Sequence, residues 1–171
     1  LLAPHDRMFP LPFHHDMPLV AEAARQAQGD VLVFTEAHCL PRPDFLEQSA
    51  AILTEHPEWA GFSGRSIPLT HNLLSEIEAE MYDEHISHNM ARHPWLKVLD
   101  QCFIVRRAAY ESSGGVEPQF GHFAEWVLAA RLHRKGLKIG FDPRAAVEHY
   151  YAGDLDELEE FTLDFSAGQM R

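Results

Sequence analysis

The sequence predicts an α/β fold, because short apolar runs alternate with segments of helical periodicity along most of the chain. Residues 31–34 form one such run, which is continuous and short, as is typical of a strand buried on both faces of a parallel sheet. The Ala-rich residues 17–28 precede it with apolar positions at helical spacing, and Gly29 follows as a helix-ending glycine. At 171 residues, 46% of them hydrophobic, the chain suits one domain with a sizeable core, so we expect a single domain over 1–171.

The remaining elements continue this alternation after an irregular lead-in, 1–16, that is rich in Pro and His. In chain order we expect a helix 45–55 capped by Asp44, a strand 59–64, a helix 72–91, a strand 98–105, a short helix 106–112, a turn 113–115, a helix 124–135 ended by Gly136, strands 137–141 and 145–149, and a C-terminal helix 153–171. On helix 72–91, apolar residues including Leu73, Ile77 and Met81 form a broken stripe, and the acidic residues between them are expected to be solvated.

Composition and charge exclude several classes of function. The formal net charge is −12, from 26 acidic residues against 14 Lys and Arg, so the surface should repel nucleic-acid phosphates and anionic lipids. Cys39 and Cys102 lack the paired spacing of a zinc or redox motif and are expected to be reduced, which indicates a cytoplasmic protein. No apolar run is long enough to span a membrane, so any attachment to a membrane surface would come from parts outside this chain.

Candidate metal ligands follow the strand 31–34 directly. Glu36 and His38 lie where ligands bind in open α/β sheets, at the carboxyl ends of strands. One acid and one histidine two residues apart are also compatible with a solvated loop. Their position at a strand end favours a site.

A second possible metal cluster lies on the helix 72–91, where Glu80, Glu84, His85 and His88 have helical spacing. A helical di-metal site would need a second such helix, and the chain offers Gly-punctuated strands instead. We therefore favour the strand-end residues.

Several segments, in order, resemble family 2 glycosyltransferases. Residues 29–38 look like the strand that leads into that family's Asp-x-Asp metal motif, with Glu36 and His38 at the two acidic positions. Residues 102–116 are similar to the family's strand, basic residue, short helix and Gly-Gly turn that precede the catalytic acid, which is the most specific match.

The resemblance continues beyond the Gly-Gly turn. Glu125 takes the position of the family's catalytic Asp, and Ala124 stands where a Glu usually precedes it. His149 takes the position at which many relatives have a histidine close to the metal and the diphosphate. For Glu125 the alternative is an exposed acid at a helix start, favoured by the helix dipole.

The resemblance implies a GT-A fold, a mixed sheet flanked by helices, and a hexosyltransferase activity. The expected reaction moves a sugar from a nucleoside-diphosphate donor to a hydroxyl acceptor with inversion, assisted by Mn²⁺ or Mg²⁺. In such a transfer one carboxylate takes the acceptor's proton while a metal stabilises the departing diphosphate. The implied roles are Glu125 as catalytic residue, Glu36, His38 and His149 as metal ligands, and Arg106, Gly114, Gly115, Trp126 and Arg131 in donor binding.

The resemblance covers residues 17–152, whereas the family normally begins with strands and a nucleotide-base-binding segment that are not found here. Three readings stay open: a fragment, a domain completed by another chain, or a shortened domain that no longer catalyses. The last would be a non-catalytic binding or scaffold module. A sugar nucleotidyltransferase is a further alternative, but its Gly-rich, Lys/Arg-bearing N-terminal loop is absent from the sequence.

Overall fold

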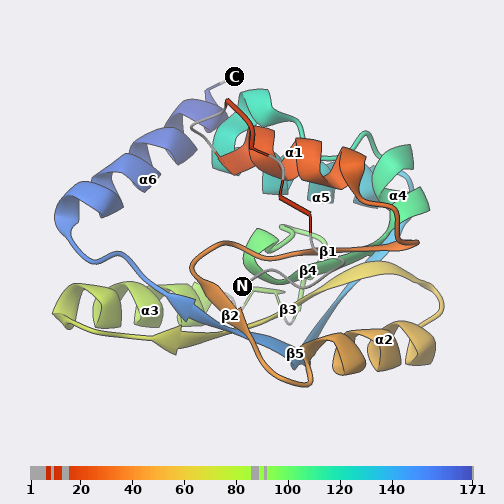
Figure 1. The fold of residues 1–171 in the computed structure, drawn as a ribbon, viewed down its shortest axis with the longest axis horizontal. Coiled ribbons are helices and arrows are strands. Elements are labelled where there is room, and N and C mark those ends of the chain that lie inside the picture. Colours follow the sequence, from red (N-terminus) through yellow and green to blue (C-terminus); the bar gives the residue numbers. More distant parts are fainter. Residues whose placement is uncertain (1–6, 9, 13–15, 86–88, 91, 171) are drawn as a thin grey trace.

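The computed structural model describes residues 7–8, 10–12, 16–85, 89–90 and 92–170, which form a five-stranded mixed sheet with helices on both faces (Figure 1). The strands are β1 (Val31–Phe34), β2 (Cys39–Pro41), β3 (Trp59–Leu69), β4 (Phe103–Arg106) and β5 (Lys138–Tyr150). The helices are α1 (Asp16–Gln26), α2 (Phe45–Glu55), α3 (Leu73–His85), α4 (Arg107–Ser112), α5 (Ala124–Arg134) and α6 (Leu155–Gln169), with 3₁₀ turns at Asp100–Cys102 and Pro118–Phe123. The predicted α/β class is confirmed, and most of the predicted lead-in 1–16 lies outside the described residues.

The order of the strands in the sheet is β1-β4-β3-β5-β2. β4 pairs antiparallel with both β1 and β3, β3 pairs parallel with β5, and β5 pairs antiparallel with β2. The expectation that residues 31–34 form a strand buried on both faces of a parallel sheet is wrong, because β1 is an edge strand of the described sheet with an antiparallel neighbour. Its Leu32 is buried while Val31 and Val33 are exposed, an alternation that an all-apolar run does not reveal.

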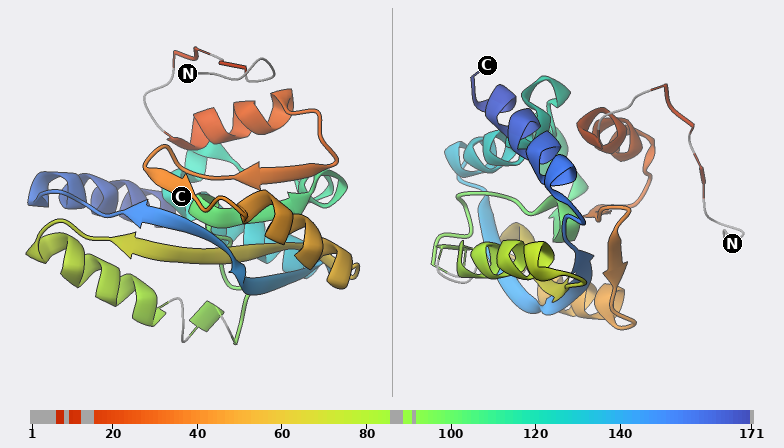
Figure 2. Two further views of the ribbon diagram at one scale, coloured as in Figure 1. Left: turned by 60° about the horizontal axis from the view of Figure 1, so that its bottom comes forward. Right: turned by 90° about the vertical axis from the view of Figure 1, so that its left-hand side faces the viewer.

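β5 replaces the two short strands predicted at 137–141 and 145–149. It runs for 13 residues, and it lies beside the long strand β3, as the left view of Figure 2 shows. The pairing register shifts between Ser63 and Arg65 of β3, opposite the segment that contains Pro143. A proline cannot donate to the ladder and is tolerated at such an irregularity, so the residues that predict a turn lie instead within one bent strand.

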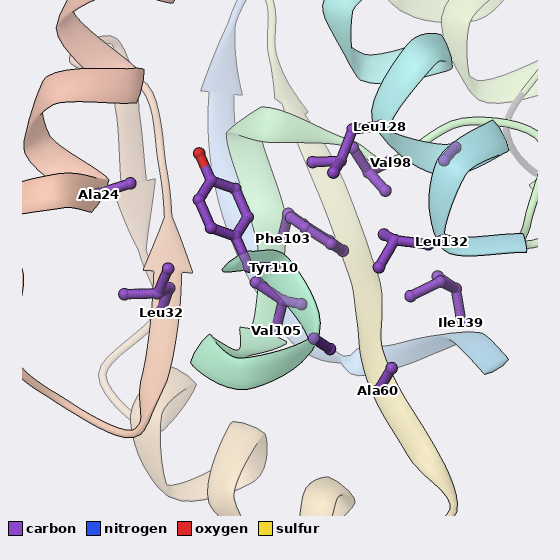
Figure 3. Packing of buried hydrophobic residues seen from close by; sticks show 12 residues of the cluster. Ala24, Leu32, Ala60, Val98, Phe103, Val105, Tyr110, Leu128, Leu132 and Ile139 are labelled. Carbon is purple, nitrogen blue, oxygen red and sulfur yellow. The ribbon is translucent and has the colours of Figure 1, made fainter. Parts of the chain in front are cut away.

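The side chains of β4 alternate between two cores. Phe103 and Val105 point to the face covered by α5, where they pack with Leu128 and Leu132 (Figure 3). Ile104 points to the opposite face and packs with the cluster that includes Ile52 of α2. Because its side chains alternate between the two faces, β4 packs against both helical layers, and this also holds the loop that leads into β4.

Helix α3 differs from expectation in the face that it buries. Leu73, Ile77 and Met81 of the predicted apolar stripe are exposed, and the small residues Ser75 and Ala79 are buried instead. Ser75 Oγ accepts hydrogen bonds from the backbone N–H groups of residues 71 and 72, which starts the helix. The helix therefore buries small side chains together with part of the ring of Tyr82, which stacks on His149 of β5.

Candidate active site

Three potential metal ligands meet where β2 pairs with β5. Glu36 and His38 lie in the turn between β1 and β2, and the register of β2 places Cys39 opposite His149 of β5. His38 Nε2 lies 3.0 Å from His149 Nε2. Glu36 Oε2 lies 3.2 Å from the His38 nitrogen and 3.4 Å from the His149 nitrogen. The structure thus brings the three residues predicted as metal ligands together.

These separations fit a shared divalent cation. Ligand atoms about 2.1 Å from one ion lie roughly 3.0 to 3.4 Å from each other in octahedral or tetrahedral arrangements. One carboxylate oxygen and two imidazole nitrogens suit Mn²⁺ or Zn²⁺ better than Mg²⁺, which prefers oxygen ligands. Cys39 belongs to the same cluster, but burial raises the pKa of its thiol to about 12, so it is a neutral neighbour unless a metal displaces its proton.

The electrostatics of the cluster favour a bound cation. Burial alone would raise the pKa of Glu36, but hydrogen bonds with His149 and His38 outweigh it and lower the pKa to about 2. The hydrogen bond with Glu36 raises the pKa of His38 against the opposing effect of burial. The cluster therefore holds a carboxylate at neutral pH, and a proton or a metal ion can neutralise it.

Aromatic rings fix the orientation of the His149 imidazole. Tyr82 of α3 stacks on it with an interplanar angle of 14°, and Tyr151 meets it edge-on with centroids 4.5 Å apart. The second ring nitrogen of His149, Nδ1, is buried without a hydrogen-bond partner in the described part of the chain. The ring thus presents Nε2 to Glu36 and His38.

The metal-ligand cluster forms one wall of a pocket of about 300 Å³. Glu125, at the start of α5, lies in another part of the same lining. The other residues that line the pocket are Glu78, Tyr82, Lys97, Asp100, Gln101, His122, Tyr150, Tyr151, Ala152 and Glu157. Acidic, aromatic and histidine side chains thus dominate the lining.

Glu125 is buried, with 3% of its surface exposed, and is not an exposed acid at a helix start. Its Oε2 forms an ion pair of 2.6 Å with Lys97 Nζ, and its Oε1 accepts a hydrogen bond of 2.8 Å from the backbone N–H of Asp100. A carboxylate in a site of this kind has a fixed orientation, which a general base requires.

Lys97 and Asp100 are pocket residues that the sequence did not reveal. They lie in the loop and the 3₁₀ turn before β4, where the sequence predicts a strand from residue 98. A lone Lys and a lone Asp at the two ends of the apolar run 98–99 were the available signal. The side chain of Gln101 in the same turn hydrogen bonds to the hydroxyl of Tyr82, which ties this loop to α3.

The residues expected to bind the donor do not line this pocket. Arg106 ends β4, and its guanidinium donates to the carbonyls of Leu53 and Trp59. Arg131 pairs with Glu117 at 2.8 Å. The remaining three, Gly114, Gly115 and Trp126, are likewise absent from the pocket lining.

The second possible metal cluster, on the helix predicted over 72–91, includes His85 and His88, whose side chains lie outside what the structure describes.

Comparison with known proteins gives one family and several structures. The sequence profile described as "Glycosyltransferase like family 2" matches residues 17–170. A search of curated proteins gives no match. In the described part of the chain, no helix combines the length and the apolar character that crossing a membrane requires.

Three similar solved structures share the fold. A mannosyltransferase from Pyrobaculum calidifontis, solved with GDP-Man and Mn²⁺, superposes with a TM-score of 0.62 at 16% identity, covering 89% of this chain and 40% of that one. A mycobacterial protein gives 0.61 at 18% identity, covering 98% and 53%. Glucosyl-3-phosphoglycerate synthase from Mycobacterium tuberculosis, solved with phosphoglyceric acid, gives 0.59 at 18% identity, covering 96% and 56%. The chain thus has a GT-A-like fold and spans about half the length of these proteins.

Proposed function

Because the chain belongs to glycosyltransferase-like family 2, we propose that it transfers a sugar from a nucleoside-diphosphate donor to a hydroxyl acceptor. The observation that carries this proposal is the shared pocket, in which Glu36, His38 and His149 form one wall and Glu125 another. A transferase of this type needs these two functions side by side, one for the leaving group and one for the acceptor.

The leaving-group end is formed by Glu36, His38 and His149. A divalent cation held there would neutralise the charge that develops on the departing diphosphate. The GDP-Man and Mn²⁺ of the Pyrobaculum calidifontis structure support this assignment by analogy of fold. Among the tyrosines that line the pocket, Tyr150 is exposed and offers an aromatic face on which a sugar ring can stack.

The acceptor end is formed by Glu125. As the acceptor oxygen bonds to the anomeric carbon, the diphosphate leaves with the electron pair of the broken C–O bond, and the acceptor proton passes to the Glu125 carboxylate. One base on the acceptor side suffices for a single displacement, so we propose inversion at the anomeric carbon. Two further pocket carboxylates have other partners: Glu78 accepts from the N–H of Ala152, and Glu157 from that of Gly153.

The alternative of a non-catalytic binding module has less support, since the metal-ligand candidates and Glu125 remain together in one pocket. It predicts neither metal-dependent nucleotide binding nor transfer, so the experiment below separates the two.

The test is calorimetric titration of the chain with UDP and GDP, each with and without Mn²⁺. We expect Mn²⁺-dependent binding of one nucleotide, and loss of that dependence in the double variant Glu36→Ala, His38→Ala. The matched control is His56→Ala, Glu58→Ala, which removes a second His–Glu pair, with ring nitrogen and carboxylate oxygen 3.5 Å apart, outside the pocket. The proposal fails for this chain if the intact protein binds neither nucleotide, or if the pocket variant binds as the control does.

A further inference from the structure

Both carboxylate oxygens of Glu125 have a defined partner, and one of these is a cation. Lys97 Nζ lies 2.6 Å from Oε2, and the N–H of Asp100 donates to Oε1. The Lys97 side chain is only 15% exposed and that of Glu125 only 5%, so water screens this ion pair weakly. The ion pair between Lys138 and Glu58, by contrast, is exposed on the surface.

The pocket has few positive charges. Among the described residues, Lys97 is the one Lys or Arg side chain in the lining, whereas five carboxyl groups line it. Three titratable groups face Glu125: Lys97 and Asp100 from the loop before β4, and Tyr82 from α3. Other titratable groups elsewhere in the lining include His122, Glu36 and His149. A buried carboxylate without a counter-ion takes up a proton, so the ionised form of Glu125 depends on Lys97.

We propose that Lys97 is the positioning residue of this site, which keeps Glu125 ionised and aims its carboxylate into the pocket. This inference rests on the proposed function, in which Glu125 is the base. Lys97 does not touch the reacting atoms in this role. It acts through Glu125.

The charge states of the two neighbours agree with this role. Burial would lower the pKa of Lys97, but the negative charges of Glu125 and Asp100 outweigh it and raise the pKa, so the ammonium persists at neutral pH. Burial, together with the charges of Glu125 and Glu36, holds the pKa of Asp100 well above its usual range, which favours the uncharged form of this carboxyl group.

The test is Lys97→Met, which keeps the aliphatic stem and removes the charge. Protonation of Glu125 is followed by carbon NMR of labelled glutamate carboxyls, and its signal is identified by its absence in Glu125→Gln. We expect the protonation midpoint of Glu125 to move up by about 1 to 3 pH units, the range by which an adjacent opposite charge shifts a carboxyl group. The acidic limb of the pH–rate profile for transfer should move by the same amount.

Two control variants define the effect. Lys97→Arg keeps the charge and should restore the wild-type profile, and Lys138→Met removes the exposed lysine charge and should leave it unchanged. A protonation midpoint of Glu125 that stays in place in Lys97→Met overturns the inference. If the wild type shows no transfer while the NMR midpoint moves, the proposed function fails and the control of Glu125 by Lys97 stands.

Misfolding of Lys97→Met has its own readout. The double variant Lys97→Met, Glu125→Gln removes both charges and should recover folding, because no unpaired ion remains in the pocket. A double variant that unfolds as the single one does would show that the misfolding does not come from an unpaired charge on Glu125, and this would also overturn the inference.

Discussion

At the scale of single residues, Glu125, which we propose acts on the acceptor, has a buried side chain whose two oxygens have different partners. Glu125→Gln keeps the size of the side chain and its hydrogen bond with the N–H of Asp100 but removes the base. We expect transfer to fall by about 10²- to 10⁴-fold, the usual contribution of a general base, and the thermal midpoint to fall as well, because Lys97 loses its buried counter-charge. Turnover of nucleotide-sugar donors is the measurement.

The matched control for that variant is Glu111→Gln, which removes an exposed helical carboxylate paired with Arg107. It should leave turnover unchanged. Undiminished turnover in Glu125→Gln would remove Glu125 from the role of base.

Asp100 has a carboxyl group whose pKa is raised by burial and by the charges of Glu125 and Glu36. Because the pKa of Asp100 is raised in the folded state, this residue contributes its full stabilisation at a pH below its pKa in the unfolded chain, about 3.8. The contribution is lost as the pH rises through the folded-state pKa. Asp100→Asn cannot ionise, so its stability relative to the wild type should increase from acidic to neutral pH. Urea denaturation across this pH range measures the difference.

The contrasting variant is Asp142→Asn. Burial would raise the pKa of Asp142, but hydrogen bonds from Arg144 outweigh it and lower the pKa. Its contribution is therefore present at neutral pH and is lost as the pH falls, so Asp142→Asn should be less stable than the wild type at neutral pH and approach it in acid. Parallel pH dependence of the two variants would refute the assignment of Asp100.

Sequence patterns identified the metal-ligand candidates but not the partners of Glu125. Glu36 and His38 directly follow a strand, and this position is readable because strand ends are marked by local composition. Lys97 and Asp100 lie in a segment without periodicity, and they reach Glu125 only through the packing of that loop against α5. Their role depends on contacts across more than 20 residues of sequence, which a local pattern does not contain.

At the scale of elements, the turn after α4 depends on a glycine that has two constraints. Gly115 has φ of 66°, and a Cβ added there would lie 2.8 Å from the ring of Tyr110. Gly136, at the end of α5, has a similar φ of 71° but open space around it. Comparing Gly115 with Gly136 therefore distinguishes the cost of backbone strain from the cost of steric contact.

We expect Gly136→Ala to cost about 1 kcal/mol of stability, the price of a left-handed conformation for a residue with a Cβ. Gly115→Ala should cost more, because the Tyr110 ring, whose hydroxyl accepts from the N–H of Val116, must also move. Chemical denaturation gives both values. Equal losses would mean that the Tyr110 ring shifts without cost.

The helices and the Gly-Gly turn were readable from sequence, but the pairing of the strands was not. α2, α4 and α5 lie within a residue or two of expectation, because their ends are marked by Pro, Gly and polar residues. The pattern around Pro143 predicts a break between two strands, and the sheet instead accommodates that residue as an irregularity within β5. Pairing with β3, about 80 residues earlier in the sequence, decides this.

At the scale of the whole molecule, the sheet joins two cores through its central strands, and the pocket lies at the end where β2 meets β5. The net charge of −12 is spread over the whole sequence, while the pocket gathers carboxylates whose charge is offset by Lys97 and, in our proposal, by a metal ion. The family match supports a glycosyltransferase, whereas the sequence resemblance alone left open a shortened, non-catalytic module.

β5 also determines when the site comes into existence. A ribosome synthesises Glu36 and His38 early, Lys97 and Glu125 later, and His149 after all of these, since it lies at the end of the last strand. The same strand supplies Ile139 to one core and Val147 to the other. A nascent chain therefore gains its third candidate metal ligand only with the strand that completes both cores, so the metal binding that we propose would require a chain whose sheet is already complete.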